Sequence, residues 1–357
     1  MHIDEIYNSL RGKTLVIPDL RPLYGRWASG VNPDYERLAE VVNEDIDKRI
    51  GDEKARQKCK AIDLAFLASA MYPRAEWEQL KTMGLFTVAL FVLDDAIDKE
   101  IDPKVQDYAS DYTAASDLRR DCIAFMRREL KLDSQPYADA ETPKEFGTFA
   151  SVASILLKAD PFQTQIPILA RDLEEFIEAS GPEQQFRLAG TIPTAEDYWS
   201  WRHGVGAVFA YATLHQYVAN TRLPADLAWS PEVMTMRVEA SFQPCLCNDL
   251  FSLKKEMREG TVTNMIPILL SDTEKTLESA VTNVVDQLHS SAERFDAAVA
   301  SLRNKGKAYD HNMQEGLERF IETFETFQTA CHNFYIRSKR FGIMDYKQQD
   351  GSFLVPL

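Results

Sequence analysis

The stretch LFTVALFVLDDAID occupies residues 85–98 and decides the fold. Its first nine residues are almost wholly apolar, and its last five contain Asp94, Asp95 and Asp98. Such an apolar run predicts a helix that is buried along most of its length. Asp94 and Asp98 are four residues apart, so they share one face of that helix. We therefore expect the carboxylates at the mouth of a buried region.

The rest of the chain shows a similar helical pattern. Apolar residues recur three and four positions apart between the proline and glycine residues, and alternating strand-like runs are scarce. The sequence therefore predicts an all-α architecture, with a loop at residues 132–147. The predicted helices run from Asn32-Pro33 to about Ile50, Arg74 to Ile97, Thr194 to about Thr221, Ser230-Pro231 to Gly260, Ser271 to Arg303 and about Tyr309 to Arg340.

The composition is that of a globular chain with an acidic balance. The 357 residues are 45% hydrophobic and 27% charged, with a net charge of −15, which disfavours a broad surface for nucleic acid or anionic lipid. No apolar run is long enough to span a bilayer, and no signal-peptide pattern is visible. The five cysteines are odd in number and lack C-x-x-C pairs, so neither a disulfide framework nor a zinc site is indicated. We expect a cytoplasmic protein without a nucleic-acid partner or stable membrane insertion.

The three aspartates would repel one another at a helix end whose dipole already disfavours negative charge. A hard divalent cation such as Mg²⁺ would relieve that repulsion, because such ions prefer oxygen ligands. The alternative is a solvated acidic helix end, and the cluster alone favours neither reading.

A second pattern of oxygen side chains is NDLFSLKKE at residues 248–256. Asn248, Ser252 and Glu256 recur every four residues, so all three project from one stripe of a helix. They would form part of an oxygen shell around Mg²⁺, with room for water and phosphate oxygens. Lys255 lies beside that shell. Alone this is also the pattern of an ordinary helix surface, but with the aspartate cluster it predicts two helices that share metal ions across a cavity.

Both patterns resemble motifs of one enzyme family. DDAID at residues 94–98 looks like the DDxxD motif of class I terpene synthases, and residues 248–256 match their NDxxSxxxE triad. The resemblance covers nearly the whole chain and is strongest to fungal and bacterial sesquiterpene synthases. It implies a single-domain α-helical bundle around a central active-site cavity, with about three Mg²⁺ ions as cofactor. The implied metal ligands are Asp94, Asp95, Asp98, Asn248, Ser252 and Glu256.

The resemblance also identifies residues for the diphosphate group. Arg202 resembles the diphosphate-sensing arginine of microbial cyclases, and Gly206 would be the effector residue in the helix break that follows. Arg340 lies where the family carries an Arg-Tyr pair, but Phe341 replaces the tyrosine, and Tyr335 is a candidate substitute. A planar guanidinium suits phosphate because it donates two parallel hydrogen bonds. The implied diphosphate-binding residues are Arg202, Lys255 and Arg340.

A carbocation must be shielded from water by apolar and aromatic side chains. Phe91 and Phe334 are the main candidates for this role, and Phe86, Leu90 and Phe242 are weaker ones. For any single aromatic residue on an apolar helix face, core packing is the more common explanation. The implied catalytic residues are Asp94, Arg202, Gly206, Phe91 and Phe334.

The implied activity is that of a Mg²⁺-dependent sesquiterpene synthase, which ionises farnesyl diphosphate, cyclises the cation to a hydrocarbon or alcohol and releases diphosphate. The catalytic α domain would span residues 31–342, after a strap or arm at 1–30 and before a tail at 343–357. A diterpene cyclase acting on geranylgeranyl diphosphate is the nearest alternative. A non-catalytic helical interaction protein, or a head-to-head condensing enzyme of the squalene synthase type, fits the motifs less well. The choice between monomer and homodimer stays open.

Overall fold

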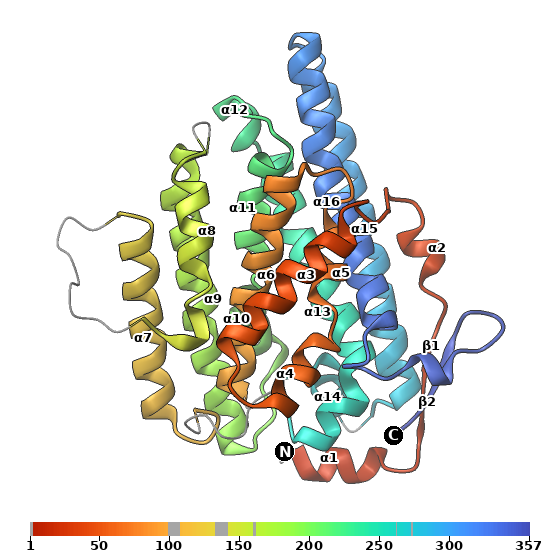
Figure 1. The fold of residues 1–357 in the computed structure, drawn as a ribbon. Coiled ribbons are helices and arrows are strands. Elements are labelled where there is room, and N and C mark those ends of the chain that lie inside the picture. Colours follow the sequence, from red (N-terminus) through yellow and green to blue (C-terminus); the bar gives the residue numbers. More distant parts are fainter. Residues whose placement is uncertain (1–2, 99–107, 133–141, 160–161, 262, 273) are drawn as a thin grey trace.

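A computed structural model describes residues 3–98, 108–132, 142–159, 162–261, 263–272 and 274–357 (Figure 1). Over these residues the chain is a bundle of α-helices with one small two-stranded sheet, which confirms the predicted all-α class. The helices are α1 Ile3–Leu10, α2 Arg21–Tyr24, α3 Tyr35–Arg49, α4 Glu53–Lys60, α5 Leu64–Met71, α6 Trp77–Asp98, α7 Tyr112–Glu129, α8 Phe149–Leu156, α9 Ile166–Ala189, α10 Ala195–Val205, α11 Val208–Val218, α12 Ala225–Ala228, α13 Pro231–Glu259, α14 Met265–Leu270, α15 Leu277–Gly306 and α16 His311–Arg337. The strands are β1 Thr14–Ile17 and β2 Phe353–Pro356, and 3₁₀ turns lie at Lys144–Phe146, Gln163–Gln165 and Met344–Tyr346.

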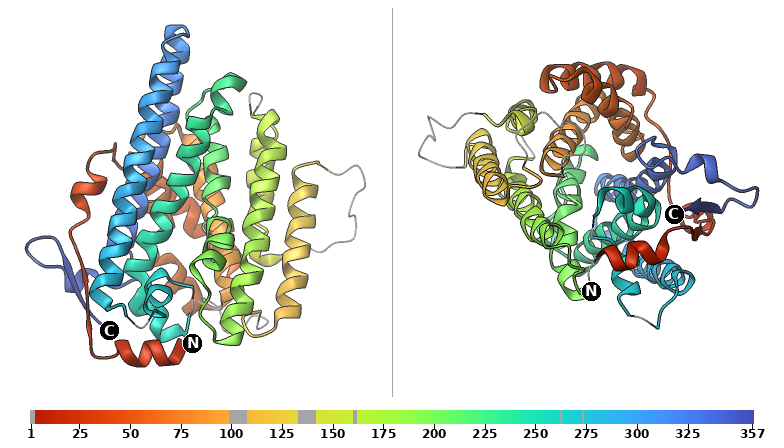
Figure 2. Two further views of the ribbon diagram at one scale, coloured as in Figure 1. Left: turned by 180° about the vertical axis from the view of Figure 1, so that it is seen from behind. Right: turned by 90° about the horizontal axis from the view of Figure 1, so that it is seen from below.

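Two long helices organise the bundle. α13 packs against α10, α11, α14, α15 and α16, and α6 packs against α3, α5, α8 and α11 (Figures 1 and 2). The apolar run of α6 is buried as its sequence predicts, and Phe86, Val88 and Leu93 are fully enclosed. Because apolar burial on both sides fixes α6 and α13, they can hold polar side chains in place between them. α15 and α16 form a hairpin that extends beyond the rest of the bundle (Figure 1).

The prediction that Asn32-Pro33 opens a helix was wrong by two residues. α3 begins at Tyr35, because the Asn32 side chain accepts a hydrogen bond from the Asp34 amide in a turn (3.0 Å). The Asn32 amide group also donates to the carbonyls of Tyr72 (3.0 Å) and Ala75 (2.9 Å). Asn32 therefore ties two loops together instead of capping a helix.

Several other helix ends differ from the prediction. The segment expected as one helix from residue 194 divides at Gly206, since Ala207 adopts a left-handed conformation with φ of 54°. The helix expected from residue 271 begins only after Thr276, which forms a capping box with Ser279. The helices expected to start at Arg74 and to end at residue 340 begin at 77 and end at 337. The predicted limits of α13 are confirmed by a Ser230 cap and by Gly260 at φ of 72°.

The two ends of the chain pair with each other. β1 and β2 run antiparallel, with Thr14 opposite Pro356 and Ile17 opposite Phe353. Helix α1 packs against α14. Residues 3–30 thus contribute α1, β1 and α2, and the segment 343–357, expected as a tail, ends in a paired strand. No helix among the described residues combines the length and apolar character that crossing a bilayer needs.

Candidate active site

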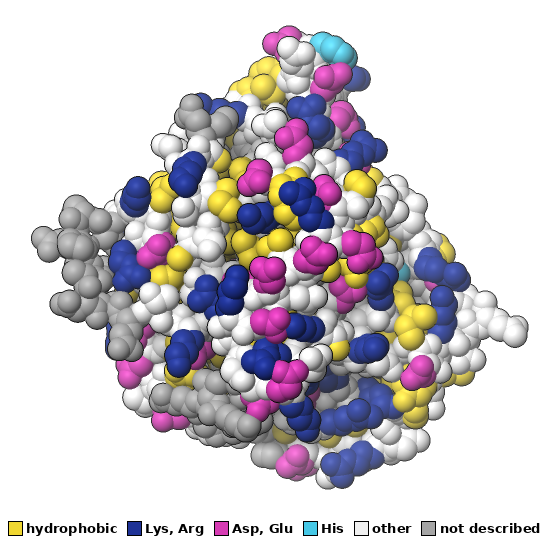
Figure 3. Space-filling model, in the orientation of Figure 1, with side chains coloured by type: hydrophobic (Ala, Val, Ile, Leu, Met, Phe, Trp, Pro, Cys, Tyr) yellow, Lys and Arg dark blue, Asp and Glu magenta, His cyan; other side chains and the backbone are white. Residues whose placement is uncertain are grey.

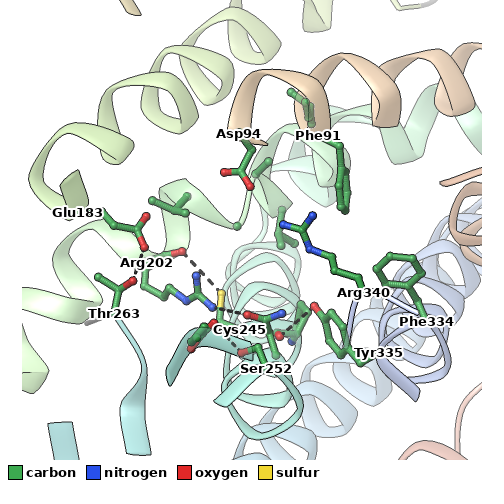
Figure 4. Close-up of a pocket in the computed structure, with 18 of the residues that line it drawn as sticks. Phe91, Asp94, Glu183, Arg202, Cys245, Ser252, Thr263, Phe334, Tyr335 and Arg340 are labelled. Atoms are coloured by element: carbon green, nitrogen blue, oxygen red, sulfur yellow. Dashed lines mark hydrogen bonds between the residues drawn. The ribbon is translucent and has the colours of Figure 1, made fainter. Parts of the chain in front are cut away.

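A cavity of about 190 Å³ lies between α6, α9, α10, α13 and the end of α16. One side, here called the polar wall, is formed by Arg202 and the α13 residues Asn248, Ser252, Lys255 and Glu256. The other, here called the apolar wall, is formed by Leu90, Phe91, Phe176, Tyr211, Phe334 and Phe341. Figure 4 shows labelled side chains from both walls pointing toward one shared space.

The predicted oxygen stripe on α13 lies on the cavity surface. Asn248, Ser252 and Glu256 all line it, and the Ser252 hydroxyl donates to one Glu256 oxygen at 2.6 Å. The other Glu256 oxygen accepts from the side-chain amide of Asn264 at 2.7 Å. Burial, with a smaller contribution from the negative charge of Asp249, raises the pKa of Glu256 to about 7. A bound cation would favour the deprotonated form of this carboxyl group.

The aspartates at the end of α6 do not behave alike. Asp94 lines the cavity and points from α6 toward it (Figure 4). Asp95 is buried in an ion pair with Arg340, with its Oδ1 2.9 Å from the guanidinium Nη1. Asp98 is the last residue of α6, and its side chain lies outside the described part of the chain. The structure therefore brings Asp94, but not Asp95, to the cavity surface.

The donor set fits a hard divalent cation. Asn248, Ser252 and Glu256 supply amide, hydroxyl and carboxylate oxygens from one helix, and Asp94 supplies a carboxylate from another. Within the described residues no three His, Cys, Asp or Glu side chains form a ready-made cage. A metal site here depends instead on amide and hydroxyl oxygens and on groups from two helices, as Mg²⁺ sites that retain water and phosphate ligands do.

Arg202 is hydrogen-bonded to two residues of α13 at the polar wall. Its Nη2 donates to Asn248 Oδ1 at 3.0 Å and to Asp249 Oδ1 at 2.9 Å. Gly206 follows α10 as its C-terminal cap and lines the cavity. A Cβ at Gly206 would lie 3.2 Å from the Cys245 sulfur, so glycine lets the helix break approach α13 closely. The guanidinium therefore engages an oxygen of Asn248 that is an expected metal ligand.

The other predicted cations also line the cavity. Lys255 forms an ion pair with Glu259 at 3.3 Å, and Arg340 lies in the turn after α16. The Tyr335 hydroxyl donates to the Pro244 carbonyl at 3.1 Å. Its hydroxyl is thus directed to α13, although its ring lines the cavity.

The apolar wall contains both main aromatic candidates. Phe91 and Phe334 meet edge to face, with ring centroids 6.2 Å apart, and Phe334 meets Phe341 at 6.0 Å. Leu90 also lines the cavity, but Phe86 lies behind it against Tyr211. The expectation for Phe242 was wrong: its ring stacks on Trp199 and does not line the cavity. Periodicity could not exclude Phe242 from the cavity, because α13 has buried residues on more than one of its faces.

Five residues near the cavity were not predicted. Glu183 lines it from α9 and accepts a hydrogen bond from the Thr263 hydroxyl. Asp249 and Tyr198 are fully buried beside Arg202, and Asn264 is buried beside Glu256. Only Asp249 had a signal in the sequence, since it lies inside the NDLFSLKKE stretch. Tyr198 lies one turn before Arg202 on α10, but its contact with Asp249 forms only when separate parts of the chain pack together, as do the contacts of Glu183, Thr263 and Asn264.

The chain is similar in sequence to known proteins. Residues 85–294 match the family described as terpene synthase family 2, C-terminal metal binding. A sesquiterpene cyclase from Aspergillus oryzae, hepA, is 26% identical over 339 residues, covering 92% of this chain and 89% of that protein. A (+)-eremophilene synthase from Sorangium cellulosum is 27% identical over 243 residues, covering 66% of this chain and 68% of that protein.

The fold also resembles a solved structure. A linalool/nerolidol synthase from Streptomyces clavuligerus superimposes with a TM-score of 0.73 at 18% identity, covering 86% of this chain and 98% of that one. At this identity the likeness concerns the fold alone.

Proposed function

This chain belongs to terpene synthase family 2 and is a terpene cyclase, and on that premise we propose that it is a Mg²⁺-dependent sesquiterpene synthase. In the proposed reaction, farnesyl diphosphate is ionised, the carbocation closes to a ring and diphosphate leaves. The observation that carries the proposal is that one cavity joins an oxygen stripe, three cationic side chains and an aromatic wall. The family supports an isoprenyl diphosphate as the substrate class, and the names of the two curated relatives support a sesquiterpene product.

The polar wall would bind the diphosphate end of the substrate. Asp94, Asn248, Ser252 and Glu256 would hold the metal ions, with Asp95 and Asp98 in support. Bound Mg²⁺ would neutralise the negative charge that develops on the leaving diphosphate. Arg202, Lys255 and Arg340 would donate hydrogen bonds to the same oxygens.

The ion pairs of the polar wall support this assignment. Arg202 and Arg340 are held 2.9 Å from carboxylate oxygens of Asp249 and Asp95, beside the space that the diphosphate would occupy. Cations that are already held in position beside the site can bind a phosphate group with little reorganisation. Gly206 would accompany Arg202, because its amide donates to the Arg202 carbonyl at 3.1 Å.

The apolar wall would stabilise the carbocation and shield it from water. The faces of Phe91 and Phe334 would stabilise positive charge through their π-electrons, and Leu90 and Phe176 would exclude water. Tyr211 is the polar member of this wall, and its hydroxyl donates to Thr87 at 3.1 Å. That hydroxyl is therefore turned toward α6.

The test is incubation of the purified protein with farnesyl diphosphate and, separately, with geranylgeranyl diphosphate, each with and without Mg²⁺. Gas chromatography–mass spectrometry of a pentane extract identifies the products, and Asn248→Ala serves as the control for the metal site. A cyclic C15 product that appears only with Mg²⁺ and farnesyl diphosphate is expected. A cyclic product from geranylgeranyl diphosphate alone would replace the sesquiterpene assignment, and no product from either would contradict the proposal.

A further inference from the structure

Asp249 follows Asn248 directly, yet it does not line the cavity. Its side chain is fully buried and accepts three hydrogen bonds, two from residues of α10 and one from the start of α14. The donors are Arg202 Nη2 on α10 at 2.9 Å, the Tyr198 hydroxyl at 2.7 Å and the backbone amide of Met265, the first residue of α14, at 2.6 Å. A buried carboxylate with this many donors is strongly fixed in place.

Tyr198 holds Arg202 from a second side. It lies one turn before Arg202 on α10, is fully buried, and accepts a hydrogen bond from Arg202 Nε at 3.1 Å. The same hydroxyl donates to Asp249. Nε and Nη2 of one guanidinium are therefore bound on two edges, which defines both the position and the plane of the group.

The same network of hydrogen bonds includes Glu256 of the oxygen stripe on α13. Asn264 is the residue before Met265. Its side-chain Nδ2 donates to the backbone carbonyl of Asp249 at 2.8 Å and to Glu256 Oε2 at 2.7 Å. Asn264 also caps α14 by accepting from the Ile266 amide at 2.8 Å. Hydrogen bonds through Asp249 and Asn264 thus connect α10, the oxygen stripe on α13 and the start of α14.

We propose that Asp249 and Tyr198 are positioning residues for Arg202, which orient the guanidinium toward the diphosphate site and couple it to α14. The inference rests on the proposed function, in which Arg202 binds diphosphate. Neither residue lines the cavity, so both act through Arg202 rather than on the substrate.

Tyr198→Phe is the sharpest test, because it removes one hydroxyl and keeps the buried charges balanced. Tyr217→Phe is the matched control: its hydroxyl contacts Thr82 Oγ1 at 3.1 Å, near the other end of α6 from Asp94. Binding of inorganic diphosphate in the presence of Mg²⁺ is measured by calorimetry for each protein. Tyr198→Phe is expected to raise the dissociation constant, and KM for farnesyl diphosphate, about tenfold. Tyr217→Phe is expected to leave both unchanged.

Unchanged diphosphate binding in Tyr198→Phe, with only a lower melting temperature, would overturn the positioning role. Failure of the unmodified protein to bind diphosphate would instead contradict the proposed function. If Tyr198→Phe does not fold, hydrogen–deuterium exchange on the unmodified protein decides the question. Addition of diphosphate and Mg²⁺ is then expected to protect the amides of residues 202–206 and 265–268 together. Protection of residues 202–206 alone would overturn the coupling to α14.

Discussion

The polar and apolar walls of the cavity hold their side chains in different ways. On the polar wall Arg202 is paired with Asp249, and Arg340, which also lines the cavity, is paired with Asp95. On the apolar wall the rings are held by packing, as in the edge-to-face contact of Phe91 with its neighbour on α16. Directional hydrogen bonds fix the orientation of the guanidinium groups, whereas packing fixes the rings, which cannot move without opening a void. The difference indicates that the polar wall presents oriented charges to a ligand and that the apolar wall presents a fixed shape.

The face of the molecule seen in Figure 3 shows no such division. Lys, Arg, Asp and Glu side chains are mixed over the face seen in Figure 3, with apolar side chains scattered between them. The ion pair of Arg26 with Asp296 (3.1 Å) is an example of a surface pair, since both side chains are more than one third exposed. Such pairs contribute little to stability. On this face, side chains of opposite charge are mixed rather than gathered in one place.

The largest effect is expected from removing a metal-binding oxygen of the polar wall. Asn248→Ala or Asp94→Ala should lower turnover by about 10³-fold or more, because stabilisation of the leaving diphosphate is lost. The helix content should stay unchanged, since both side chains face the cavity. Product analysis and circular dichroism check these two outcomes. Full activity in either variant would contradict the assignment of the metal ligands.

A smaller loss is expected when Arg202 becomes lysine. Arg202→Lys keeps the charge but loses the planar fork, so kcat/KM should fall about 10- to 100-fold. The matched control is Arg26→Lys in the surface pair with Asp296, which should be neutral. Steady-state kinetics of both variants give the comparison. Equal kinetics for the two would mean that the guanidinium of Arg202 has no special role.

On the apolar wall the expected change is in the product rather than in the rate. Phe91→Ala removes a ring that faces Phe334. Diphosphate release should slow by less than about tenfold, because the variant loses the energy of one cation–π contact. The share of linear or early-quenched products should rise, because water gains access to the cation. Chromatography of the extract measures this ratio. An unchanged product mixture with a large loss of rate would mean that Phe91 acts in ionisation of the substrate, as the polar wall does, and not in guiding the carbocation.

The smallest effect concerns stability behind the apolar wall. His215, one turn after Tyr211 on α11, is fully buried against Phe324 with ring centroids 4.4 Å apart. Burial, assisted by the charge of Arg237, lowers its pKa to about 3. In the unfolded chain the imidazole takes up a proton near pH 6.5. Stability is therefore unaffected above that pH and falls as the pH drops from about 6.5 toward 3.

At pH 5 the proton uptake by unfolded His215 should cost about 2 kcal/mol of unfolding free energy. His215→Phe should remove that part of the acid sensitivity. Urea titrations at pH 7 and pH 5 measure the difference for both proteins. A variant that loses as much stability as the unmodified protein between these pH values would show that His215 is not kept neutral by the fold.

The sequence was most informative where the chemistry is local. The apolar run of residues 85–93 and the four-residue spacing at 248–256 predicted two helices and the faces of Asp94 and Asn248, because helical periodicity alone fixes those faces. The break at Gly206 came only from the resemblance to a family. The start of α3 was missed because Asn32 bonds to residues 40 and 43 positions away.

Contacts between distant parts of the chain could not be predicted. Arg340 and Asp95 are 245 positions apart, and their ion pair forms only when the turn after α16 meets the end of α6. Asp249 appeared in the motif, but nothing in its neighbours along the chain shows that it meets Tyr198 and Met265. Periodicity gives the face of a helix, whereas the partner of that face depends on the tertiary fold.

The central claim is that ionisation at the polar wall and cyclisation at the apolar wall are two parts of one Mg²⁺-dependent reaction. The most direct test follows diphosphate release and organic product in the same tube, with farnesyl diphosphate as substrate, first with Mg²⁺, then after EDTA and after Mg²⁺ is restored. We expect diphosphate and a cyclic C15 product to form in equal amounts, to stop together and to resume together. Cyclic product that continues to form in EDTA, or diphosphate released without any cyclic product, would contradict the account.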